Sequence, residues 1–240
     1  MRNRQPSIAA RVAGLDWARV TEDLDAQGAA LAGSLLARPE CDALAGSYAE
    51  EEPFRSRVVM GRHGFGRGEY KYFSYPLPDL IGALRTAIYP RVAPIASRWN
   101  AKMGVNNRFP DKHAKFIERC HAAGQRRPTP LLLDYGVDDY NCLHQDLYGE
   151  HVFPLQVVIL LSEPERDFTG GELVMTEQRP RMQSRPMVLP LRQGDAAVIA
   201  VSHRPVQGTR GVYRVNLRHG VSRVRSGHRR TLGIIFHDAE

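Results

Sequence analysis

The chain has 240 residues, of which 42% are hydrophobic, so it can bury one substantial core and is expected to form a single domain over 1–240. It contains no apolar run of about eighteen residues, the length that a membrane-spanning helix needs, and its first residues lack the apolar core of a signal peptide. We therefore expect a cytoplasmic, monomeric protein with no membrane contact.

The positive charge is carried by arginine. The formal net charge is +7, and only four of the 33 basic residues are lysine. Guanidinium groups pair well with phosphate, so this balance favours a polyanionic partner such as nucleic acid. A basic pI also occurs in enzymes that never bind nucleic acid, so the charge alone does not decide the substrate.

The first 128 residues are predicted to be mostly helical. Pro39 suits the first turn of a helix, whereas Pro90 and Pro94 are predicted to interrupt the helix that an apolar stripe indicates before them. A short strand is expected over 29–36. The predicted helices cover 15–27, 39–50, 80–88, a further segment ending near 107, and 111–122.

Glycines alternate with aromatic and basic residues over 62–75. This segment is predicted to be either a hairpin that packs on the core or a flap over a substrate. Tyr70 and Tyr72 within it, together with Tyr140 further on, are candidates for contact with a substrate.

The second half, 129–240, is predicted to be a jelly roll. Short runs of branched and aromatic residues alternate with Gly, Pro and Asp turns, a pattern typical of a double-sheet β fold. We expect a double-stranded β-helix core with the helical N-terminal region layered on one sheet. The predicted strands cover 131–135, 155–161, 172–176, 187–191, 196–201, 213–219 and 231–236.

His144 and Asp146 are separated by one residue at the end of a predicted strand. Side chains on a strand alternate faces, so these two point the same way. His219 ends an apolar-alternating run and is the predicted third ligand, ahead of His203, which also follows a strand. Two imidazoles and a carboxylate on one face of Fe(II) leave positions open for a co-substrate and O2. Cys142 is expected to be a buried small hydrophobe rather than a ligand.

Arg229 and Thr231 share one face of the last predicted strand. A guanidinium with a hydroxyl two residues on suits the distal carboxylate of a dicarboxylic acid. Arg230 shares its face with apolar residues, so strand phase favours Arg229 as the anchor, although a β-bulge would reverse the choice.

These residues resemble the H-x-D…H…R-x-S/T signature of the Fe(II)/2-oxoglutarate-dependent dioxygenases. Tyr135 and the run from Gly170 to Leu173 resemble features of the prolyl-hydroxylase-like branch, and the whole chain resembles a bacterial family labelled as oxidative demethylases of alkylated DNA. The resemblance implies Fe(II) on His144, Asp146 and His219, with 2-oxoglutarate on Arg229, Thr231 and Tyr135. It also implies O2 as oxidant, ascorbate as an added reductant, and C–H hydroxylation with release of succinate and CO2.

Three hypotheses about function remain. The leading one is oxidative demethylation of alkylated nucleic acid in DNA repair, which needs an extruded base and stacking aromatics. The second is hydroxylation of a protein side chain, as in prolyl hydroxylases. The third is a cupin-like metal-binding module without catalysis, which would not explain Arg229 with Thr231.

Overall fold

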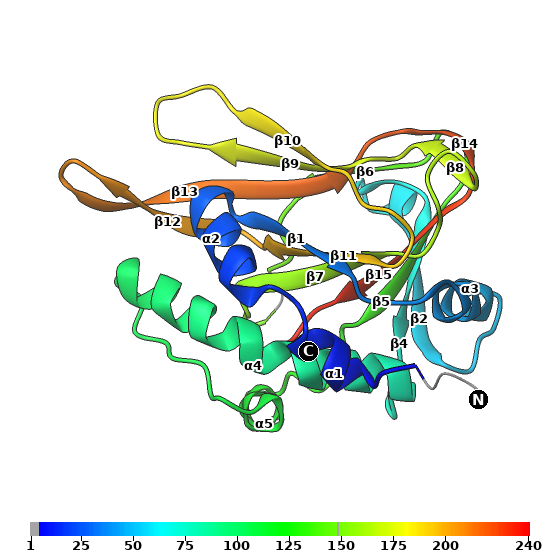
Figure 1. The fold of residues 1–240 in the computed structure, drawn as a ribbon, viewed down its shortest axis with the longest axis horizontal. Coiled ribbons are helices and arrows are strands. Elements are labelled where there is room, and N and C mark those ends of the chain that lie inside the picture. The colour runs from blue at the N-terminus through cyan, green and yellow to red at the C-terminus, as the bar shows by residue number, and fades with distance from the viewer. Residues whose placement is uncertain (1–4, 148) are drawn as a thin grey trace.

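Two antiparallel sheets lie one over the other in the computed structural model, which describes residues 5–147 and 149–240 (Figure 1). The larger sheet has seven strands in the order β1-β11-β7-β15-β5-β4-β2. All six residues of β7 are buried, because this central strand is covered on both faces. The strands are β1 (Ala29–Ser34), β11 (Asp195–Ala200), β7 (Leu155–Leu160), β15 (Arg229–Ile234), β5 (Leu131–Tyr135), β4 (Glu69–Phe73) and β2 (Phe54–Val59).

The smaller sheet has the order β10-β9-β13-β6-β3, and β12 also pairs with β13. The β9–β10 and β12–β13 hairpins extend beyond the larger sheet on one side of the molecule (Figure 1). The strands are β10 (Arg185–Leu189), β9 (Leu173–Gln178), β13 (Gly211–Val221), β6 (Tyr140–His144), β3 (Gly66–Arg67) and β12 (His203–Gly208), and a separate pair joins β8 (Phe168–Gly170) to β14 (Val224–Gly227).

This arrangement is the jelly roll that the strand pattern predicts, and the protein is mainly β. Most of the helices lie on the side of the larger sheet that faces away from the smaller one, while the helix Trp17–Gln27 packs against β1 and also contacts β12 (Figure 1). They are α1 (Ile8–Ala13), α2 (Trp17–Gln27), α3 (Arg38–Ser47), α4 (Asp79–Lys102) and α5 (His113–Ala122), with a short 3-10 turn at Met60–Arg62.

The prediction of a helix broken at Pro90 and Pro94 is wrong. Helix α4 runs without interruption through both prolines. Each proline removes one hydrogen bond of the helix, but the same stretch buries large apolar side chains, including Tyr89, Val92 and Trp99. Tertiary burial of this face therefore outweighs the local cost of the prolines.

The N-terminal half is also more than a helical layer. Strands β1, β4 and β2 extend the larger sheet at its two ends, and β3 pairs with β6 in the smaller one. Within the described residues, no helix is both long and apolar enough to span a membrane.

A buried ion pair connects α4 to the C-terminal segment that follows β15. Arg85 and Asp238 lie 2.7 Å apart and are 2% and 0% exposed. Arg85 also donates to the carbonyl of Ile235 at 2.9 Å. Burial lowers the pKa of the nearby His113 and His237 to about 4, so both imidazoles are neutral at pH 7.

Candidate metal centre and its pocket

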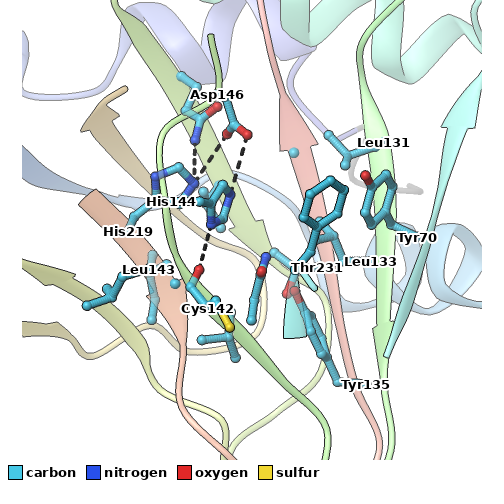
Figure 2. A pocket seen from close by; sticks show the side chains of 18 of the residues that line it. Tyr70, Leu131, Leu133, Tyr135, Cys142, Leu143, His144, Asp146, His219 and Thr231 are labelled. Atoms are coloured by element: carbon cyan, nitrogen blue, oxygen red, sulfur yellow. Dashed lines mark hydrogen bonds and ion pairs between the residues drawn. The ribbon is translucent and has the colours of Figure 1, made fainter. Parts of the chain in front are cut away.

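His144, Asp146 and His219 meet between the two sheets. One ligand atom from each lies within 4.8 Å of the others. The geometry follows from strand pairing, because His219 on β13 is directly opposite His144 at the end of β6, and Asp146 follows two residues later. Figure 2 shows the carboxylate facing both imidazoles.

Both histidines direct Nε2 toward the carboxylate. Asp146 Oδ1 is 3.4 Å from Nε2 of His144, and Oδ2 is 3.3 Å from Nε2 of His219. Nδ1 of His144 lies 2.8 Å from the carbonyl of Cys142. A proton on Nδ1 donated to that carbonyl leaves the Nε2 lone pair free for a metal, which is the usual arrangement of a histidine ligand.

The protonation states also suit a cation. Burial alone would raise the pKa of Asp146, but hydrogen bonds from the two imidazoles hold it well below its usual value. Burial lowers the pKa of His219. At neutral pH the site therefore offers an ionised carboxylate and a neutral His219 imidazole; burial alone would lower the pKa of His144, but the contact with Asp146 raises it, and a bound metal would replace that proton.

Arg229 reaches the same pocket from β15 in the larger sheet. It is only 1% exposed, yet among the described residues it forms no ion pair, and its Nε has no hydrogen-bond partner. Nη1 donates to Thr231 Oγ1 at 2.5 Å. Burial lowers the pKa of Arg229 to about 10. A buried guanidinium without a counter-ion is costly, so this group is built to receive an anion.

Arg230, unlike Arg229, already has a carboxylate partner. Its Nε donates to Asp134 at 2.8 Å on the adjacent strand β5, and it does not line the pocket. No bulge shifts the pairing of β15 with β5, so Arg229 and Thr231 share the inward face.

Gly171 makes room for Arg229. A Cβ at this position would lie 2.8 Å from Cδ of Arg229, and the backbone has a φ of +63°, which favours glycine. The Gly170–Gly171 pair thus has a steric reason in this chain. Tyr135, opposite Arg229 in the strand pairing, lies with its ring 5.5 Å from the guanidinium carbon.

Of the three tyrosines predicted to contact a substrate, two line the pocket and one does not. Tyr70 and Tyr72 line the pocket, where their rings meet edge to face at 5.3 Å. Tyr140 does not line the pocket, and its side chain is exposed. It begins β6, one residue before the stretch that lines the pocket from Asn141 onward.

One other expectation needs correction. Cys142 is exposed and lines the pocket instead of being buried. His203 begins β12 opposite Asn216 and is not part of the metal-binding group found among the described residues. It therefore does not compete with His219.

Two pocket residues were missed from the sequence. Gln156 on β7 is buried, with its amide nitrogen 2.9 Å from Nε2 of His219. Phe65 is 48% exposed at the pocket and stacks on His63 with ring centroids 5.3 Å apart. A polar residue inside an otherwise apolar buried strand was a usable signal for Gln156. Phe65 lies in the glycine-rich aromatic segment 62–75 that the sequence marks as a hairpin or flap, but no pattern within that segment favours it over Tyr70 and Tyr72.

A jelly roll that places two imidazoles and a carboxylate beside a buried guanidinium defines a 2-oxoglutarate- and Fe(II)-dependent oxygenase. Residues 68–239 match the model of a family described as "Oxygenase, catalysing oxidative methylation of damaged DNA". Since this match spans more than half of the chain, the protein belongs to that family.

The chain is also similar to two uncharacterized relatives and to several solved structures. Two uncharacterized proteins of Mycobacterium tuberculosis, from strains CDC 1551 and H37Rv, are each 50% identical over 182 residues, covering 75% of this chain and 78% of theirs. The fold is similar to that of a Pseudomonas putida prolyl-4-hydroxylase, with a TM-score of 0.53 and 14% identity over 93% of this chain and 99% of that one. A 2OG-Fe(II) oxygenase-family oxidoreductase of Burkholderia pseudomallei has a TM-score of 0.50 and 17% identity, over 100% and 96%. These distant structural similarities concern the fold.

Proposed function

We propose that His144, Asp146 and His219 hold Fe(II), and that Arg229 and Thr231 bind the distal carboxylate of 2-oxoglutarate. The observation that carries this proposal is the buried guanidinium of Arg229 in the same pocket as the three ligands, which forms no ion pair within the described part of the chain and whose Nε has no hydrogen-bond partner there. A dicarboxylic acid that reached the metal with one end and Arg229 with the other would remove the cost of burying that charge.

Bound iron would supply the O2-dependent oxidation of 2-oxoglutarate to succinate and CO2 that accompanies hydroxylation of a substrate C–H. The chain's own residues would orient the two reactants and exclude water. The cavity has a volume of about 320 Å³. Apolar side chains from the larger sheet, among them Leu131, Leu133 and Val158, line it, so the walls hold a reactive centre away from solvent.

The test is turnover without a primary substrate. The purified protein with Fe(II), ascorbate and 2-oxoglutarate should form succinate slowly, and Asp146→Ala should form none above background. Absence of both succinate formation and 2-oxoglutarate binding in the unaltered protein would instead support a non-catalytic metal-binding module.

We further propose that the primary substrate is an N-alkylated nucleic acid. The +7 charge favours a polyanion, and the description of the family model supports damaged DNA. Phe65 lines the pocket and stacks on the exposed His63 beside it, and such an aromatic surface suits an extruded base. Hydroxylation of an N-methyl group would be followed by release of formaldehyde and the unmodified base.

A methylated single-stranded oligonucleotide, assayed beside proline-containing peptides, tests this substrate. Formaldehyde release from the oligonucleotide is the expected result. Phe65→Ala should lower it by about 5- to 150-fold, because base stacking on an aromatic ring contributes on the order of 1–3 kcal/mol. Tyr140→Ala is the matched control, since this exposed aromatic lies outside the pocket. Hydroxylation of the peptides alone would reject the nucleic-acid substrate.

A further inference from the structure

Gln156 is a polar residue in a strand that is otherwise apolar. The six residues of β7 are Leu155–Leu160 and all are buried. Gln156 is 4% exposed and lines the pocket. A buried carboxamide is costly unless it has a partner, so its contacts indicate why it is there.

Gln156 contacts the imidazole nitrogen of His219 that a bound metal would need as a ligand. Its amide nitrogen lies 2.9 Å from Nε2 of His219, the same nitrogen that faces Asp146 at 3.3 Å. An imidazole nitrogen carries either one proton or one lone pair. Whichever way the amide is turned, its contact uses the Nε2 position that a bound metal would occupy.

Metal binding therefore releases the Gln156 amide. Because side chains alternate along a strand, Val158 shares the inward face with Gln156, and Leu173 from the smaller sheet lines the same pocket. These apolar neighbours offer no hydrogen-bond acceptor. The carboxylate of Asp146, which faces the same nitrogen of His219, would itself be taken up by the metal, so the released amide needs another partner beside the metal.

We propose that Gln156 binds the keto-acid end of 2-oxoglutarate, donating its N–H to the carboxylate next to the keto group. This inference rests on the proposed function and extends it. The co-substrate is then held at both ends, by a charged guanidinium at the distal carboxylate and by a neutral amide at the proximal one. The amide thus has one partner in the empty site and another in the loaded site.

Gln156→Leu tests this proposal because leucine is similar in size and suits the apolar strand. Calorimetric titration with Mn(II) alone, followed by 2-oxoglutarate on the Mn(II)-loaded protein, separates the two binding steps. We expect Mn(II) to bind at least as tightly as in the unaltered protein, since the amide no longer competes for Nε2. We expect 2-oxoglutarate to bind about 10- to 100-fold more weakly, as befits loss of a hydrogen bond to a charged group.

Unchanged 2-oxoglutarate affinity in Gln156→Leu would overturn the inference while leaving the proposed function intact. Weakened Mn(II) binding would also overturn it, because Gln156 would then only support His219. Gln156→Met, which is unbranched and of similar length, provides the same test if the leucine variant does not fold. Failure of the unaltered Mn(II)-loaded protein to bind 2-oxoglutarate would instead reject the proposed function itself.

Discussion

Replacing Arg229 with methionine should make the ligand-free protein more stable and its co-substrate binding weaker. Burial lowers the pKa of Arg229 from 12.5 to about 10, so the folded protein disfavours the charged form. Each unit corresponds to about 1.4 kcal/mol, and the charge therefore costs the fold on the order of 3 kcal/mol at neutral pH. Methionine keeps most of the aliphatic packing without the charge, so Arg229→Met should raise the free energy of unfolding by up to that amount.

Binding should change in the opposite direction. Removing one partner of a buried charge pair costs roughly 2–5 kcal/mol, which corresponds to a 2-oxoglutarate affinity lower by about 30-fold to several thousand-fold. Thermal unfolding with Mn(II) present measures both effects. The unaltered protein should gain melting temperature when 2-oxoglutarate is added, whereas Arg229→Met should start higher and gain little.

Arg230→Met is the matched control. Arg230 already has a carboxylate partner in Asp134 and lies outside the pocket, so its loss should leave the 2-oxoglutarate response intact. Normal 2-oxoglutarate binding by Arg229→Met, together with unfolding at a lower temperature than the unaltered protein, would contradict the proposed role of Arg229. It would also be refuted if Arg230→Met were the variant that lost binding.

Three further outcomes are expected. Asp146→Asn keeps the shape of the side chain but removes its charge, and Mn(II) affinity measured by calorimetry should fall by more than the 10- to 100-fold typical of losing an outer partner; normal affinity would exclude Asp146 as a ligand. The pKa of His113 and His237 is lowered to about 4 in the folded protein, so the unfolded chain binds more protons below about pH 6.5. The free energy of unfolding should therefore fall as the pH drops from about 6.5 to 4, by up to about 3 kcal/mol per histidine, and denaturant titrations showing a flat profile would contradict this. Gly66→Ala would place a Cβ 2.4 Å from the carbonyl of Tyr140 and should impair turnover of the primary substrate more than 2-oxoglutarate binding. Gly64→Ala, which also has a positive φ but open space around its Cβ, is the control, and equal effects of the two variants would argue against a role for the contact with β6.

The carbonyl of Phe65 accepts a hydrogen bond from the backbone N–H of Cys142 at 2.9 Å, and the carbonyl of Cys142 lies against Nδ1 of His144. The aromatic pair of Phe65 and His63 is thus connected through the backbone to a proposed metal ligand. Gly66 allows the close approach of β3 to β6, so a side chain at this position should displace the aromatic pair and the backbone that supports His144.

The sequence by itself determined the parts of the site that depend on strand periodicity. His144 and Asp146 share a face because side chains alternate along an extended chain, and the same rule separates Arg229 from Arg230. The jelly roll followed from short apolar runs between turns. These are local consequences of backbone geometry, so they can be predicted without knowing which segments are neighbours.

Only the tertiary structure decided which strands lie side by side and what each side chain faces. The pairing of His219 with His144, the position of Tyr140 outside the pocket and the contact of Gln156 with His219 all join residues far apart in the chain. The continuity of α4 through Pro90 has the same origin. For α4, burial of its apolar face against distant segments outweighed the local preference of the chain, because the stabilisation scales with the apolar surface removed from water. The other cases depend on which strands are neighbours, which local preferences do not specify.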